Sequence, residues 1–383
     1  SGIIRLKVEG HSGHKITMKP GELLEKDSTL NQRASGGPYL WNYTLSGKGV
    51  EEWQPQFTYY GFRYVEVSDI EKLELIELAG MHTTNSAPEA GSFSCSLPMF
   101  NKIYELIDWS IRSNLASILT DCPHREKLGW LEVAHLMQHA MQYRYQLDGL
   151  YSKVMGDIKD SQTQEGIVPS IAPEYVRFAD GFENSPEWGS AFIIIPWYVY
   201  RWYGDKSLLS TYYPYMKRYL EYLSTRADNY IVAYGLGDWF DLGPKHPGYS
   251  QLTSNGVTST GMYYYNASRM SQIAKLLGEE KDEERFKQLA TCIRKAYNEK
   301  FYNTVTKQYD RNSQTANAIS LYFGLVEEQN REVVYQNLIN DIKNRDYALT
   351  SGDIGYRYLL RVLEENGDSD IIYKMNTKYD VPG

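Results

Sequence analysis

The sequence has few cysteines, no long apolar run and no excess of basic residues. Its three cysteines, Cys95, Cys122 and Cys292, lie far apart and in no metal-ligand spacing, which argues against a disulfide framework or a zinc knuckle. The longest apolar run, 191–200, is half of the roughly 20 residues that cross a bilayer. The chain has 40 Lys+Arg against 48 Asp+Glu and a formal net charge of −8, and this acidic balance argues against a nucleic-acid surface. We therefore predict no membrane, nucleic-acid or metal partner.

A targeting segment is also lacking, but the chain opens on Ser1 and Gly2 rather than on Met. The absence of a leader therefore says nothing about the compartment. What the sequence does contain is aromatic residues: 34 Tyr, 8 Trp and 11 Phe make up 14% of the 383 residues. With 42% hydrophobic residues, the chain has enough apolar surface to fold, and its length suits two or three domains.

The first part of the chain, residues 1–90, has the pattern of an antiparallel β-sandwich. Ile4, Leu6 and Val8 alternate with polar residues, and strand-like runs follow at 57–60, 62–67 and 73–76, separated by turn residues. Five or six strands fit this length, so we expect the sandwich to be partial.

The rest of the chain, residues 91–383, has helical periodicity. Ten helices with no intervening strands suggest stacked helical hairpins, and an (α/α)6 toroid, which needs twelve helices, would be nearly complete. The expected helices cover 98–117, 131–158, 188–203, 206–226, 257–277, 281–299, 314–324, 327–343, 354–366 and 368–376.

The densest set of chemically useful side chains lies between two expected helices. Within 120–132 are Asp121, Arg125, Glu126, Trp130 and Glu132. A glycosidase needs one carboxylic acid that stays protonated near neutrality, which an apolar neighbour such as a Trp promotes, and a second carboxylate that activates water or attacks directly. The alternative is structural: Asp121 caps a turn, and Arg125 and Glu126 form a solvated ion pair.

Two histidines follow this segment at helical spacing. His135 and His139 share one helix face and have the spacing of two zinc ligands. The protease motif needs Glu directly after the first His, and Leu136 stands there instead. We interpret both as packing or hydrogen-bonding histidines, and we keep open that His135 reaches the site beside Glu132.

Two further segments place a carboxylate beside a Trp in or next to a long loop. A carboxylate accepts hydrogen bonds from sugar hydroxyls, and an indole ring stacks on the C–H face of a sugar. The alternative is that these Trp residues belong to the core. The residues concerned are Glu187 and Trp188 in one segment, and Asp238, Trp239 and Asp241 in the other.

The run Asp121–Trp130 (DCPHREKLGW) resembles the signature of bacterial α-L-rhamnosidases, glycoside hydrolase family 78. Further similar segments follow in the same order along the whole chain. The resemblance implies an (α/α)6 catalytic barrel preceded by a β-sandwich, and inverting hydrolysis of terminal α-L-rhamnosides. We expect no cofactor. The similar segments are 55–67 (PQFTYYGFRYVEV), 185–191 (SPEWGSA), 234–244 (YGLGDWFDLGP), 313–318 (SQTANA) and 350–359 (TSGDIGYRYL).

Carried over by position, the resemblance implies that Glu126 is the general acid. It also implies that Asp121 binds rhamnose hydroxyls and that Trp130 forms a wall of the sugar pocket. The expected substrate-binding residues are Asp121, Arg125, Trp130, Glu132, Glu187, Trp188, Asp238, Trp239 and Asp241.

Two departures from the family pattern matter. Val133 stands where many members have Asp, and Glu132 is its possible replacement, although one residue along a helix turns the side chain by about 100°. The chain also ends just before the segment in which the family carries its general base. We therefore expect a fragment whose base and closing helices lie beyond residue 383.

Two other functions stay open at this point. One is a non-catalytic carbohydrate-binding homologue, for which Val133 would be an early sign. The other is an (α/α)6 hydrolase or lyase for another sugar, although a lyase would want a basic groove for uronates and the net charge is −8. We expect a rhamnose-containing oligosaccharide or glycoside as the ligand. We expect export to the periplasm or the cell exterior and leave the cytoplasm open; the oligomeric state is unknown from the sequence.

Overall fold

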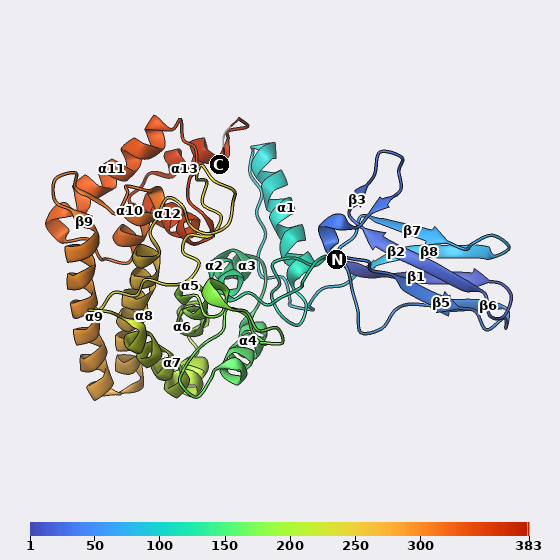
Figure 1. The fold of residues 1–383 in the computed structure, drawn as a ribbon, viewed down its shortest axis with the longest axis horizontal. Coiled ribbons are helices and arrows are strands. Elements are labelled where there is room, and N and C mark those ends of the chain that lie inside the picture. The colour runs from blue at the N-terminus through green and yellow to red at the C-terminus, as the bar shows by residue number, and fades with distance from the viewer. Residues whose placement is uncertain (381, 383) are drawn as a thin grey trace. The chain divides into compact units, whose positions relative to one another are not determined.

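A computed structural model describes residues 1–380 and 382 of the chain (Figure 1). It divides into two compact units. The first contains residues 1–133 and 139–150, and the second contains residues 134–138 and 151–383.

The first unit begins with two facing antiparallel sheets (Figure 1). One sheet has the strand order β6-β1-β8, the other has the order β5-β2-β7, and β3 pairs with β4. The strands are β1 (Gly2–Glu9), β2 (Lys15–Gly21), β3 (Leu23–Leu24), β4 (Leu30–Asn31), β5 (Trp41–Thr44), β6 (Val50–Trp53), β7 (Tyr64–Ser68) and β8 (Glu74–His82).

Alternating side chains of the central strands form the core of this sandwich. Ile4, Leu6 and Val8 of β1 point inward and are at most 1% exposed, and they meet Ile16 and Met18 of β2. The period of two predicted from the sequence is the reason, because successive strand residues point to opposite faces of a sheet.

The expectation of a strand at 57–60 is wrong. Only Tyr60 pairs there, in an isolated bridge to Gly2. Phe57 has a φ of +58°, a left-handed conformation that a bulky residue rarely adopts and that cannot continue a strand. The segment is a loop, although its composition is typical of a strand.

The single helix expected at 131–158 is in fact three: α2 (Leu131–Leu136), α3 (Gln138–Arg144) and α4 (Asp148–Ser161). The second break has a visible cause. The Ala90 N–H donates to the Arg144 carbonyl at 2.8 Å, and the Gln146 N–H donates to the Pro88 carbonyl at 2.9 Å. These bonds take backbone groups that a continuous helix would use. The helix before this region, α1, covers Pro98–Asn114.

In the second unit, one set of helices forms an inner layer. Helices α6, α8, α10 and α12 contact one another in chain order, while α7, α9, α11 and α13 each pack on an inner helix. This alternation is the pattern of stacked helical hairpins (Figure 1). The helices are α5 (Pro186–Gly189), α6 (Ala191–Tyr203), α7 (Ser207–Arg226), α8 (Asn255–Leu277), α9 (Glu280–Phe301), α10 (Gln314–Tyr322), α11 (Arg331–Asn344), α12 (Asp353–Glu365) and α13 (Ser369–Asn376), with a short β9 (Tyr302–Asn303) and β10 (Gln308–Tyr309) pair between α9 and α10.

Burial separates the inner helices from the outer ones. Eight of the nine residues of α10 are buried, whereas only five of the 22 residues of α9 are. Within the part of the chain that the structure describes, no helix has both the length and the apolar character needed to cross a membrane.

We predict that Leu6→Ala lowers the apparent free energy of unfolding of the sandwich by about 2–5 kcal/mol, because it leaves a cavity at a position with 0% exposure. Chemical denaturation followed by tryptophan fluorescence measures the change. The matched control is Leu23→Ala, at a side chain that is 47% exposed, for which we expect a change below about 0.5 kcal/mol. Equal effects for the two variants would contradict the described core.

Candidate active site

The loop between α1 and α2 brings two carboxyl groups together. An oxygen of Asp121, the sulfur of Cys122 and an oxygen of Glu126 all lie within 4.8 Å of one another. Asp121 is exposed, and the side chain of Glu126 is 25% exposed. The carboxyl pair is therefore accessible to a ligand.

Arg125 determines which of the two carboxyls is ionised. Its guanidinium binds Glu126 with two hydrogen bonds, from Nε to Oε2 and, at 3.1 Å, from Nη2 to Oε1. Burial alone would raise the pKa of Glu126, but the bonds from Arg125 outweigh it and lower this pKa to about 2. Burial and the adjacent negative charge of Glu126 raise the pKa of Asp121 to about 6. Between about pH 2 and pH 6 the pair therefore shares one proton, which resides on Asp121.

Loops of the sandwich hold this segment in place within the first unit. The Gly61 N–H donates to the Pro123 carbonyl at 2.8 Å, and the Tyr39 hydroxyl donates to the Arg125 carbonyl at 3.3 Å. The Lys127 ammonium donates to the Tyr59 carbonyl at 2.8 Å. The backbone that carries Glu126 is thus fixed on both sides of it.

Lys127 was not among the residues selected from the sequence. Its ammonium lies 4.2 Å from the Tyr60 ring centroid and 4.9 Å from the Tyr59 ring centroid, and partial burial lowers its pKa. Two aromatic faces and a carbonyl replace much of its water. The aromatic run in 55–67, together with a Lys directly after Glu126, was the only available signal.

Trp130 and Glu132 differ in how far they are exposed. Trp130 is half-buried just before α2, whereas Glu132, in the first turn of α2, is only 8% exposed. The role of Glu132 as a replacement sugar ligand stays a prediction, and its burial gives it little access to a ligand. His135 is fully buried, with its Nε2 2.8 Å from the Glu187 carbonyl, and is a packing histidine as the sequence indicated.

In the second unit, Trp239 lies in an aromatic cluster. Its ring centroid is 5.2 Å from those of Phe182 and Phe240 and 5.5 Å from that of Tyr249. Trp239 is half-buried, while Phe240 and Tyr249 are 48% and 50% exposed. This cluster offers an accessible ring surface of the kind predicted for a sugar platform.

The neighbouring Asp238 faces the interior instead. It is fully buried and accepts hydrogen bonds from the Thr315 hydroxyl, the Gly352 N–H at 2.9 Å and the Gly355 N–H at 2.8 Å. Burial raises its pKa to about 7, against the effect of these donors. Gly352 and Gly355 lie at the start of α12, so the carboxyl of Asp238 caps that helix from a distant loop.

Glycine is required where the loop that carries Asp238 meets the start of α12. A Cβ on Gly352 would lie 2.2 Å from the Trp239 carbonyl oxygen and 2.7 Å from the Asp241 nitrogen. The next residue, Asp353, donates its N–H to the same Trp239 carbonyl at 2.9 Å. Part of this residue is exposed, but protein atoms around its carboxyl displace water from that group and raise its pKa to about 6. Asp353 is a second candidate residue that the sequence interpretation missed.

Asp241 and Glu187 also have their oxygens occupied. Asp241 is 2% exposed and accepts from the backbone N–H groups of Gln251 and Leu252. Glu187 is fully buried and accepts from the hydroxyls of Ser185 at 2.7 Å and Ser259 at 2.9 Å. In the described structure these carboxylates hold loops together rather than face a ligand.

Trp188 is 1% exposed and lies within the short helix α5. It is therefore a core residue, which is the alternative that the sequence left open. Of the expected site residues, the structure thus brings Asp121, Arg125 and Glu126 together in an accessible group. Trp130 and Trp239 keep part of their rings accessible. Asp238, Asp241, Glu187, Trp188 and Glu132 lie in the interior.

Asp121, Cys122 and Glu126 are also the kind of side chains that bind metal ions. Burial raises the pKa of the Cys122 thiol to about 11, which disfavours the thiolate that a metal would need. That the protein works without a metal or a cofactor stays a prediction.

Stacked helical hairpins that follow an antiparallel sandwich along the chain, together with an accessible carboxyl pair in the loop between α1 and α2, are the features of the six-hairpin glycosidases. The model of the bacterial α-L-rhamnosidase six-hairpin glycosidase domain matches residues 88–383, and that of the bacterial α-L-rhamnosidase concanavalin-like domain matches residues 1–83. The chain belongs to the bacterial α-L-rhamnosidase family. The fold class predicted from the sequence is confirmed.

Individual relatives agree with this assignment. The chain is 31% identical over 380 residues to an α-L-rhamnosidase of Streptomyces avermitilis and 32% identical over 404 residues to one of Formosa agariphila, covering 98% and 100% of this chain. It spans 35% and 42% of the length of these two relatives.

Solved structures are similar over the whole chain. The α-L-rhamnosidase from Dictyoglumus thermophilum has a TM-score of 0.89 and 35% identity, covering 99% of this chain and 43% of that one. The Streptomyces avermitilis α-L-rhamnosidase complexed with L-rhamnose has a TM-score of 0.86 and 29% identity, covering 98% of this chain and 36% of that one.

We predict that Asp238→Asn lowers the apparent free energy of unfolding by about 1–3 kcal/mol, because the amide nitrogen that replaces one carboxyl oxygen is itself a donor and faces the N–H of Gly352 or Gly355 in a fully buried site. Thermal unfolding followed by circular dichroism measures it. The control is Asp160→Asn, at a side chain that is 75% exposed and should change stability by less than about 0.5 kcal/mol. A stable Asp238→Asn variant that has lost only sugar binding would contradict the capping role.

Proposed function

We propose that the protein hydrolyses terminal α-L-rhamnosides. The observation that carries the proposal is the accessible pair of Asp121 and Glu126, which shares one proton beside Arg125. Family membership supports it, as does the relative solved in complex with L-rhamnose. Because the chain spans 35–42% of the length of the relatives compared above, the activity is proposed for the whole natural protein that contains it.

Glu126 is the proposed proton donor to the glycosidic oxygen. In the ligand-free arrangement Arg125 keeps it ionised, and the proton resides on the hydrogen-bonded neighbour Asp121. We propose that hydroxyls of the bound sugar replace Glu126 as the hydrogen-bond acceptors of the Arg125 guanidinium. The pKa of Glu126 then rises, and the proton moves from Asp121 to Glu126 and on to the leaving oxygen. Asp121, now ionised, accepts hydrogen bonds from the hydroxyls of the bound sugar.

The aromatic residues supply the apolar contacts in this proposal. Trp130 ends the loop of residues 115–130 between α1 and α2, which carries Glu126 and is called the acid loop. Trp239, with its aromatic neighbours, belongs to the second unit. Both Trp residues keep part of their ring surface accessible. Asp238, Asp241 and Glu187 act indirectly, by holding the loops and helix ends of the second unit.

Inversion also needs a carboxylate that activates water on the opposite face of the sugar, about 6.5–9.5 Å from the acid. Asp121 is an unsuitable base, because one of its oxygens lies within 4.8 Å of an oxygen of Glu126, which is closer than the separation that inversion requires. We propose that the base is another carboxylate of the whole protein.

We predict that Glu126→Gln in the whole protein lowers kcat/KM about 100- to 10,000-fold for an α-L-rhamnosyl disaccharide, whose leaving group needs a proton. The loss should be far smaller for α-L-rhamnosyl fluoride, because fluoride leaves without protonation. Product release assayed by chromatography and a fluoride electrode gives the two rates.

The matched control for this test is Glu89→Gln, at a carboxylate of the same unit that is 70% exposed and pairs with Arg144. We expect it to retain the wild-type rates. A near-normal rate of Glu126→Gln on the disaccharide would show that the acid is another residue. Saturable rhamnose binding by a wild-type protein without turnover would indicate a binding homologue instead.

We predict that kcat/KM for the disaccharide falls about tenfold per pH unit above pH 6. The pKa of Asp121 is raised to about 6, so the pair holds one proton below this pH and loses it above. A pH–rate profile between pH 4 and 9 measures this limb. With α-L-rhamnosyl fluoride the same limb should be weak or absent. A disaccharide rate that stays constant to pH 8 would show that the shared proton is not the one transferred.

A further inference from the structure

Lys127, which directly follows the proposed acid Glu126, has a backbone conformation that a lysine rarely adopts. Its φ is +54°, in the left-handed region that is unfavourable for a residue with a Cβ. Such a conformation persists only where the surrounding contacts hold it, and it is found most often at functional sites. The contacts that hold Lys127 therefore also determine the course of the chain at Glu126.

Three tyrosine rings lie close to the Lys127 ammonium. The distances from its nitrogen to the ring centroids are 4.2 Å for Tyr60, 4.9 Å for Tyr59 and 5.9 Å for Tyr39. All three are within the roughly 6 Å over which a cation is attracted to an aromatic face. The Tyr59 carbonyl also accepts a hydrogen bond from the ammonium at 2.8 Å. Tyr39, Tyr59 and Tyr60 are called the tyrosine cage below.

The tyrosine cage is itself anchored in the sandwich. The ring centroids of Tyr39 and Tyr60 are 4.8 Å apart, and the Tyr60 ring lies 5.3 Å from that of Trp41, a core residue with 5% exposure. Tyr60 and Gly2 also exchange backbone hydrogen bonds of 2.9 and 3.0 Å. The cage is therefore a fixed support for the lysine.

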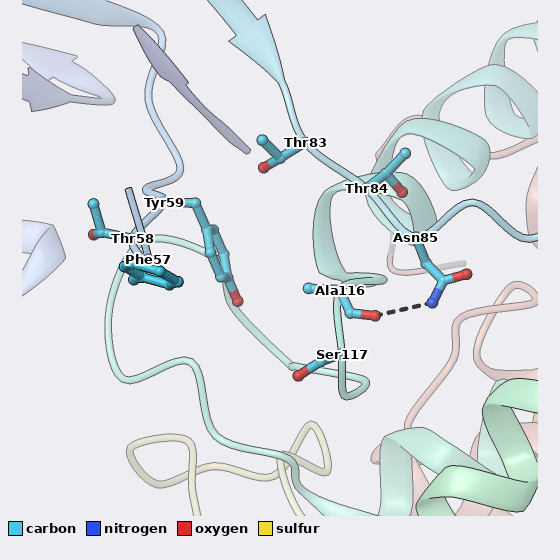
Figure 2. Close-up of a pocket in the computed structure, with 8 residues that line it drawn as sticks. All are labelled: Phe57, Thr58, Tyr59, Thr83, Thr84, Asn85, Ala116 and Ser117. Carbon is cyan, nitrogen blue, oxygen red and sulfur yellow. Dashed lines mark hydrogen bonds between the residues drawn. The ribbon is translucent and has the colours of Figure 1, made fainter. Parts of the chain in front are cut away.

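Tyr59 connects the cage to the start of the acid loop. Its side chain lines a cavity of about 380 Å³ together with the bend after α1 (Figure 2). Asn85 holds this bend, because its backbone N–H donates to the Leu115 carbonyl at 2.6 Å and its side-chain amide donates to the Ala116 carbonyl at 3.2 Å (Figure 2). The acid loop is thus fixed at its start and again at Lys127.

The proposed proton transfer needs a support of this kind. In the ligand-free arrangement the Arg125 guanidinium holds Glu126 with two hydrogen bonds, and in the proposed mechanism this guanidinium exchanges Glu126 for sugar hydroxyls. Glu126 must then stay beside Asp121 without those bonds, since a displacement of about 1 Å can lower the rate about 100-fold. The contacts of Lys127 with the tyrosine cage are not exchanged in this step.

We propose that Lys127 is a positioning residue for the acid, held by the tyrosine cage so that Glu126 keeps its place while Arg125 changes partner. The proposal rests on the proposed role of Glu126 as proton donor. It also gives the sandwich a part in catalysis, because the three tyrosines belong to the concanavalin-like part of the chain, residues 1–83.

The test compares Lys127→Met with the wild type in the whole protein on an α-L-rhamnosyl disaccharide and on α-L-rhamnosyl fluoride. Met keeps a long side chain beside the rings but has neither the charge nor the hydrogen bond. For the disaccharide we expect kcat to fall about 10- to 100-fold with KM within about threefold, because the acid is displaced. For the fluoride, which leaves without protonation, kcat should stay within about threefold.

Variants of the cage separate the cation–ring contact from other effects. Lys127→Arg restores a cation at the rings and should recover most of the disaccharide rate. Tyr60→Leu removes the nearest ring and should reproduce the selective loss, whereas Tyr60→Phe keeps the ring and should not. The matched control is Lys102→Met, at a side chain of the same unit that is 61% exposed, and it should leave both rates unchanged.

Two results would overturn the positioning role. Equal losses of Lys127→Met on both substrates would show a merely structural role, and an unchanged disaccharide rate would show that the cage does not position the acid. Either result leaves the acid assignment intact if Glu126→Gln still loses the disaccharide rate selectively. A near-normal disaccharide rate of Glu126→Gln would overturn the acid assignment, and the positioning role with it.

Discussion

A carboxylate removed from water must be given hydrogen-bond donors, and much of this structure is arranged to meet that constraint. In the second unit Asp238, Asp241 and Glu187 are buried. Asp238 and Glu187 accept from hydroxyls or backbone N–H groups of distant segments, and Asp241 accepts from backbone N–H groups of its own loop. A single carboxyl thereby joins a long loop to the start of α12, since Asp238 binds Gly352 and Gly355. Removing such a group leaves several donors unsatisfied, so these positions contribute to stability more than to ligand contact.

The acid loop of the first unit meets the same constraint in a different way. Among the described residues, Arg125 is the cation that binds the pair of Asp121 and Glu126, and it donates both of its hydrogen bonds to Glu126. The two groups therefore divide their proton unequally, with the pKa of one near 6 and that of the other near 2. In a carboxyl pair with unequal pKa values next to solvent, the proton can move from one carboxyl to the other when a ligand displaces the cation. A buried carboxylate whose oxygens all accept hydrogen bonds has no such partner to exchange a proton with.

The sequence pattern predicts much of the fold because it is set by local geometry. The period of two in β1 follows from the pleat of a strand, and the helix ends at Gly204 and Gly278 follow from the left-handed conformation that glycine adopts there. The run 131–158 does not form the single expected helix, and its second break comes from backbone bonds to 88–90, far away in the chain. The segment 57–60 was misinterpreted because strand-forming composition does not reveal that Phe57 has a positive φ.

For the candidate site, the sequence by itself determined which residues are chemically suited and, through the run 121–130, to which family the chain belongs. Only the tertiary structure decided which of them face a ligand. Asp238 and Trp239 are adjacent in the chain, yet one is fully buried and the other keeps part of its ring accessible. The physical reason is that accessibility and pKa depend on donors and neighbours supplied by remote segments, such as Gly352 for Asp238 and Tyr59 for Lys127, and no local pattern encodes them.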